Sequence, residues 1–212
     1  MNRRLSALLA TSGAVALTFA LSTPPTLATT IDSTYTTTPG GTITATAGRT
    51  TLTDGRSAAV IACASSSVSI TLPGDGIPHA GSGFGKITAF SFSGCTLGTT
   101  IAYTVTTNAL PWGLNIASFN TVHNVVHGSI TGINMTLAGA GGCTAVVDGT
   151  AAGAHNGYVK WEYGNEDGKL TTVKANGKLV LYDTAGCGTL FVSNDPVALV
   201  GVYTLSPPQD IT

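Results

Sequence analysis

Apolar residues recur at every second position along most of the chain after residue 42, and polar residues, mainly threonine and serine, fill the positions between them. This period of two indicates β-strands with one face in a core and the other in water. The clearest alternating segments are 42–47, 86–93, 99–107 and 129–137, and glycine-rich gaps separate them. The pattern predicts an all-β fold, either an antiparallel β-sandwich of Ig-like or jelly-roll-like type or, as the alternative, a closed β-barrel.

A three-stranded meander is predicted toward the C-terminal end. Segments 158–163, 169–175 and 178–182 have strand character, and a glycine-bounded turn joins the first two. Asn176-Gly177 joins the second to the third. This dipeptide is favoured in two-residue hairpin turns because both central residues adopt positive φ.

The first 28 residues have the three-part layout of a secretory signal peptide. Arg3 and Arg4 begin it, an uncharged apolar run covers residues 5–21, and small residues lead to Ala28. Cleavage is expected after Ala28, with Ser22 as the second choice. Export of the mature chain to the outside of the cell or to the cell surface follows from this layout.

The remaining chain has the length of one domain. Residues 29–41 are rich in threonine, proline and glycine and are expected to form a flexible lead-in, so that residues 42–212 make up a single β-sandwich domain. No later apolar run is long enough for a spanning helix, so no integral membrane segment is expected after cleavage of the leader.

The chain carries very little charge. Charged residues make up 9% of the sequence, against about 25% in ordinary proteins. Without Arg3 and Arg4, seven basic residues face ten acidic ones. A nucleic-acid partner is not expected, because binding a polyanion requires a basic stripe that releases counterions.

The four cysteines are expected to form disulfides, because an even number in an exported chain is typical of a disulfide framework. Of the three pairings that four cysteines allow, we favour the sequential one, Cys63 with Cys95 and Cys143 with Cys187. Zinc sites use closely spaced pairs of cysteines, and these four are all more than thirty residues apart. No metal site is expected.

Neither catalytic residues nor a cofactor site are predicted. His123 and His127 are four residues apart but lack the central glutamate of a zinc protease motif, and we interpret them as solvated residues of a strand. Glu162, Glu166 and Asp167 cluster near one turn, where carboxylates are usually solvated. Asn165, Glu166, Asp167 and backbone carbonyls offer oxygen ligands that calcium accepts, although the chemistry of a turn explains these residues without a metal.

Three aromatic residues are the candidate ligand contacts. Trp161 and Tyr163 share one face of a predicted strand with Val159, and Trp112 begins another strand. A row of exposed rings would form a platform on which sugars stack. The alternative is that this face belongs to the core, because Lys160 and the other polar residues of the strand lie on its opposite face. We favour the core interpretation.

The chain also resembles the small exported bacterial proteins named as activators of alkane oxidation. The resemblance covers residues 42–115 and rests on Val60-Ile61-Ala62-Cys63, on the segment 87–95 (ITAFSFSGC) and on Leu110-Pro111-Trp112. It implies an exported, non-catalytic accessory protein at the cell surface and transfers no catalytic residues.

These observations predict a secreted, non-enzymatic accessory or contact protein that acts on a component at or outside the bacterial cell envelope. Two alternatives remain open. One is a module that binds a polysaccharide or an apolar small molecule, and the other is an envelope-embedded β-barrel pore.

Overall fold

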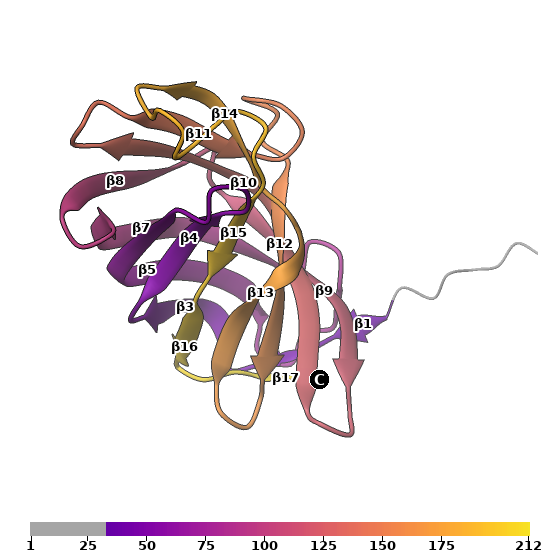
Figure 1. Ribbon diagram of the computed structural model, residues 1–212. Helices are drawn as coiled ribbons and strands as arrows, with labels where there is room; N and C mark the ends of the chain where they lie inside the picture. The colour runs from indigo at the N-terminus through magenta and orange to yellow at the C-terminus, as the bar shows by residue number, and fades with distance from the viewer. Residues whose placement is uncertain (1–32) are drawn as a thin grey trace, which may run out of the picture. The chain divides into compact units, whose positions relative to one another are not determined.

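Figure 1 shows the computed structural model, which describes residues 33–212 except the side chains of residues 175 and 176. Within this part of the chain every regular element is a β-strand. The strands are β1 (Thr34–Tyr35), β2 (Thr37–Thr38), β3 (Gly40–Ala47), β4 (Thr50–Asp54), β5 (Val60–Gly74), β6 (His79–Ala80), β7 (Gly85–Leu97), β8 (Ile101–Asn108), β9 (Trp112–Asn120), β10 (Val125–Gly139), β11 (Thr144–Asp148), β12 (Gly157–Gly164), β13 (Lys169–Lys178), β14 (Val180–Ala185), β15 (Val197–Val200), β16 (Val202–Ser206) and β17 (Asp210–Ile211).

One large antiparallel sheet contains thirteen of these strands, and its pairings return on themselves. From β5 they lead to β7, β9, β10, β12, β13, β16 and β3, and from β3 back to β5. The prediction of an antiparallel all-β fold is therefore confirmed. The opposing layers expected of a sandwich are parts of one continuous sheet that curls into a ring.

The long strand β10 connects the ring to the remaining strands. Residues 125–131 pair with β9 on one side and β12 on the other, whereas residues 134–139 pair with β8 and β11. The register shifts at Gly132, whose φ is +83°. Any residue with a Cβ would be strained at that angle, so glycine allows the strand to change partners at this point.

The period of two in the sequence corresponds to an inner and an outer face of the sheet. Along β12, the side chains of Val159, Trp161 and Tyr163 are buried, while those of Lys160 and Glu162 face outward. Since this alternation repeats around the ring, apolar side chains fill the interior and threonine and serine cover much of the outside.

Both expected disulfides are present. Cys63 on β5 lies directly opposite Cys95 on β7 and is bonded to it. The second bond joins Cys143, at the turn between β10 and β11, to Cys187, which follows β14. The sequential pairing is confirmed, and each bond closes a loop within one half of the chain.

The expected lead-in is wrong for residues 34–41, which belong to the folded structure. Tyr35 and Thr37 are buried. Thr37 Oγ1 and the backbone N–H of Gly40 both donate hydrogen bonds to Gln209 Oε1, at 3.0 and 2.9 Å. A short segment rich in threonine and glycine has no strong local preference, and in residues 34–41 contacts with residues 209–212 supply the missing hydrogen-bond partners. Cleavage after Ala28 lies outside the described residues.

The hairpin expected at Asn176-Gly177 is also absent. β13 runs through these residues to Lys178, and β14 pairs with β11 instead of returning along β13. Lys160 pairs with Val173 and Tyr158 with Lys178, so the extra residues of β13 form a bulge opposite β12. Gly177 does not have a positive φ there, so the bulge does not use the backbone angle that a two-residue hairpin turn requires.

A buried carboxylate holds the loop between β11 and β12. Asp148 Oδ2 accepts hydrogen bonds from Asn134 Nδ2 and His155 N, at 2.7 and 3.0 Å. Its Oδ1 accepts from the backbone N–H groups of Gly149 and Asn156, at 2.7 and 3.1 Å. Burial on its own would raise the pKa of Asp148, but these four hydrogen bonds together lower it.

Asp148 should therefore make the fold sensitive to acid. Because its pKa in the folded state is below the unfolded value of about 3.9, its ionised form stabilises the fold above about pH 4, and this contribution is lost as the pH falls through the folded pKa. Asp148→Asn should lower the free energy of unfolding by about 2 kcal/mol at pH 7, since an amide N–H₂ group replaces one acceptor oxygen. Urea unfolding at pH 7 and pH 3 measures both effects, with Asp75→Asn on an exposed turn as the control. If the free energy of unfolding changed with pH equally in the wild type and in Asp148→Asn, this role of Asp148 would be contradicted.

Candidate functional site

The three aromatic candidates all lie on the inner face of the sheet. Trp112, Trp161 and Tyr163 are no more than 1% exposed. Trp112 Nε1 donates to the carbonyl oxygen of Asn108 at 2.9 Å, and the Tyr163 hydroxyl donates to the carbonyl oxygen of Gln209 at 2.6 Å. These rings are core residues, and no face of them is free for stacking on a sugar.

Trp161 occupies the space that a side chain at position 128 would need. A Cβ on Gly128 would collide with the indole ring and with the carbonyl oxygen of Asn115. The bare backbone of β10 therefore allows the largest side chain of β12 to lie flat beneath it. This close approach explains why glycine occurs in the middle of a buried strand.

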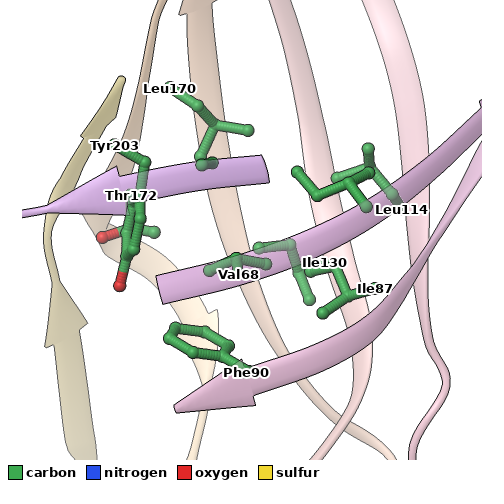
Figure 2. Close-up of a pocket in the computed structure, with 10 residues that line it drawn as sticks. Val68, Ile87, Phe90, Leu114, Ile130, Leu170, Thr172 and Tyr203 are labelled. Atoms are coloured by element: carbon green, nitrogen blue, oxygen red, sulfur yellow. The ribbon is translucent and has the colours of Figure 1, made fainter. Parts of the chain in front are cut away.

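A small void in the interior of the ring is shown in Figure 2. Its volume is about 20 Å³, and its lining side chains include Val68, Phe90, Leu114, Ile130 and Tyr203, which come from five different strands. One water molecule needs at least about 10–15 Å³ together with two to four polar partners. The void is apolar and the size of a single water, so it has no room for a ligand.

The predicted histidine pair is split between two elements. His123 lies in the exposed turn between β9 and β10, and His127 lies on the outer face of β10. His127 stands directly opposite Glu162 on β12, with Nδ1 3.5 Å from Oε1. Among residues 33–212, no group of three His, Cys, Asp or Glu side chains is arranged to hold a metal ion.

Hydrogen bonds within the protein engage the polar residues of the turn between β12 and β13. Asn165 Nδ2 donates to Asn124 Oδ1 and to the carbonyl oxygen of Ile211, at 2.8 and 2.9 Å. Asp167 Oδ1 accepts from the backbone N–H of Lys169 at 3.1 Å. The chemistry of the turn, together with a contact to the C-terminal end, accounts for these residues.

The charged side chains gather instead along two hollows on the outer face of β10, β12 and β13. The hollows have volumes of about 230 and 310 Å³, and Glu162 lines both of them. We call this feature the charged trough, and it comprises His123, His127, Lys160, Glu162, Glu166, Asp167 and Lys169.

The distribution of charge makes the trough unusual for this protein. After position 28 the chain has seventeen charged residues, and seven of them, including both glutamates, lie between residues 160 and 178. Lys160 and His127 stand at one end, whereas Glu166 and Asp167 stand at the other with Lys169. Because lysines and carboxylates line the trough together, it suits a polar ligand or a protein surface that carries both signs of charge.

The sequence did not reveal the trough as a unit. Alternation correctly placed Lys160 and Glu162 on the outer face of their strand. However, the histidines and the carboxylates were treated as separate groups, because the pairing of β10 with β12 cannot be read from local pattern. Only the register brings His127 opposite Glu162.

Comparison with known proteins finds no relative of this chain. The chain matches no family model, no curated protein and no solved structure. The resemblance to exported activators of alkane oxidation stays a prediction. In the described part of the chain, no helix is long and apolar enough to cross a membrane.

Proposed function

We propose that this protein is an exported, non-enzymatic protein that acts by contact at or outside the bacterial cell envelope. The observation that carries the proposal is the distribution of side chains in the ring, with apolar ones inside and polar ones outside. Its interior is packed with apolar side chains, so the groups that a partner can touch lie on the outer face of the sheet and in the exposed turns. Two disulfides within one small all-β unit are typical of proteins that work in an oxidising compartment outside the cytoplasm.

The same distribution disfavours the envelope-embedded pore. A pore of strands needs a polar lumen and an apolar outer band. Here Phe90, Trp112 and Leu114 point inward, while Thr44 and Ser67 are exposed on the outside. This arrangement is that of a protein surrounded by water.

A binding module is the second candidate, and the charged trough favours it. The trough is concave and carries several charged side chains, which suit a hydrated ligand such as a polysaccharide more than an apolar small molecule. The small void in the core is also too small for an apolar ligand.

Sedimentation with washed bacterial envelopes tests the proposal. The purified chain without its leader, residues 29–212, should sediment with envelopes at about 50 mM salt. Binding through the trough should weaken at about 500 mM salt, because salt screens exposed charges. Lys160→Glu should weaken this binding to envelopes through the trough about fivefold, equivalent to about 1 kcal/mol. Arg49→Glu, which makes the same charge change on an exposed turn outside the trough, is the control.

Three outcomes separate the candidates. Retention of the wild type and of Arg49→Glu, with weaker retention of Lys160→Glu, supports contact through the trough. Equal retention of all three proteins supports contact through another face. A wild-type protein that stays in the supernatant at every salt concentration would contradict the contact proposal itself.

A further inference from the structure

A second part of the outer surface is almost uncharged and carries hydroxyl groups in rows. It covers the outward positions of four neighbouring strands of the ring, β16, β3, β5 and β7. We call it the hydroxyl array, and it comprises Thr42, Thr44, Thr46, Ser67, Ser69, Thr71, Ser91, Thr204 and Ser206. All of them are exposed except Ser69, which is half-buried.

The strand register lines these hydroxyls up across the sheet. In the longest row, Thr204 is opposite Thr46, Thr46 is opposite Ser67, and Ser67 is opposite Ser91. A second row contains Ser206, Thr44 and Ser69, and in a third Thr42 is opposite Thr71.

The spacing within the array follows from the geometry of a sheet. Neighbouring strands lie about 4.8 Å apart, and alternate residues along a strand lie about 6.8 Å apart. The longest row therefore extends about 14 Å across four strands.

Most of these hydroxyls have no partner within the protein. In the described part of the chain, Thr44 Oγ1 alone among them makes a hydrogen bond, a long one of 3.5 Å to the carbonyl oxygen of Ser206. The free hydroxyls can both donate to and accept from a partner outside the protein.

Charge separates the array from the trough. Lys86 lies opposite Thr71 and Lys169 lies opposite Thr204, so lysines stand only at the borders of the array. Lysine and glutamate occur on the outer face of β12, which belongs to the same ring, but not within the array.

We propose that the hydroxyl array binds the surface of an ordered, uncharged polysaccharide. This inference rests on the second candidate function, the binding module, but it places the ligand on the hydroxyl array instead of the charged trough. A neutral face with matched donors and acceptors is complementary to sugar hydroxyls and offers nothing to a charged partner. Each hydrogen bond replaces one to water and contributes little, so binding needs many contacts at once, which an ordered polymer surface provides and a short soluble sugar does not.

Retention on insoluble polymer tests the inference. The probes are microcrystalline cellulose and chitin, each at low and high salt. The wild type should be retained on at least one of them, equally at both salt concentrations. The double variant Thr44→Glu/Ser67→Glu should be retained at least tenfold less, because its carboxylates would lose water on contact with the polymer without gaining a counter-charge.

The matched control is Thr104→Glu/Thr106→Glu, which adds two glutamates at exposed positions of β8, outside the array. Its retention should equal that of the wild type. Thermal melting of both variants verifies that they are folded, and size-exclusion chromatography reports self-association.

Each other outcome overturns the inference. Equal retention of the array variant and the wild type excludes the array as the binding face, and retention that salt abolishes assigns binding to charge. A wild-type dimer that the array variant dissociates assigns the face to a second copy of the chain. If neither polymer retains the wild type while envelopes still do, the array inference fails and the contact proposal stands.

Discussion

Trp161→Ala should lower the free energy of unfolding by about 3–5 kcal/mol, because it removes the largest side chain of β12 from a packed interior and leaves a cavity. The indole is 1% exposed and lies against the bare backbone of Gly128. The surrounding strands are joined in a ring, so they cannot collapse into the space easily. For a domain of this size the melting temperature should fall by about 10 °C, and thermal melting with urea titration measures both quantities.

Two further variants make this prediction specific. Tyr158→Ala truncates an aromatic side chain on the opposite face of the same strand. It should lower the free energy of unfolding by about 1 kcal/mol or less. Within residues 33–212 the buried Trp161 Nε1 has no hydrogen-bond partner, so Trp161→Phe loses no hydrogen bond and should cost less than half as much as Trp161→Ala. A normal melting curve for Trp161→Ala, combined with lost retention on polysaccharide, would mean that the ring contacts a ligand.

Removal of one disulfide should have an effect of similar size. Replacing Cys143 and Cys187 by alanine opens a bond with a sequence separation of 44 residues, and the loss of this constraint on the unfolded chain corresponds to about 4 kcal/mol in the loop-entropy model. Urea unfolding of the variant and of the wild type, both without reductant, measures the difference.

The other disulfide provides the comparison. Replacing Cys63 and Cys95 by alanine opens a bond with a separation of 32 residues, which corresponds to about 3.7 kcal/mol. The strands β5 and β7 stay hydrogen-bonded in that variant. If the unfolding midpoint of either variant matched that of the wild type, the corresponding bond would not constrain the unfolded chain as proposed.

The sequence predicted those features that depend on local pattern. Alternation placed Val159, Trp161 and Tyr163 on the inner face, and the structure has them there. The cysteine spacing predicted the two bonds that are found. Both inferences need only the pleat of a strand or the cost of closing a loop, and neither depends on which strands become neighbours.

Features that depend on distant pairing were not predicted. Asn176-Gly177 has the composition of a hairpin turn, but pairing of β12 with β13 continues beyond it and makes it a bulge. Residues 34–41 resemble a flexible tail until Gln209, far away in the chain, supplies their hydrogen-bond partner. The charged trough and the hydroxyl array likewise exist only because strands separated by tens of residues lie side by side.

The end of the described chain is fastened to its beginning. The backbone N–H of Thr36 donates to the carbonyl oxygen of Thr212 at 2.8 Å, and the N–H of Thr212 donates back to the carbonyl oxygen of Thr36 at 3.1 Å. A peptide linker of a few residues could therefore join position 212 to position 33, and new termini could be opened at the exposed turn 98–100, between β7 and β8, without breaking a strand pair. Such a circular permutant would move any attached cargo from this seam to the turn between β7 and β8, which would let one scaffold present the same cargo from two different places.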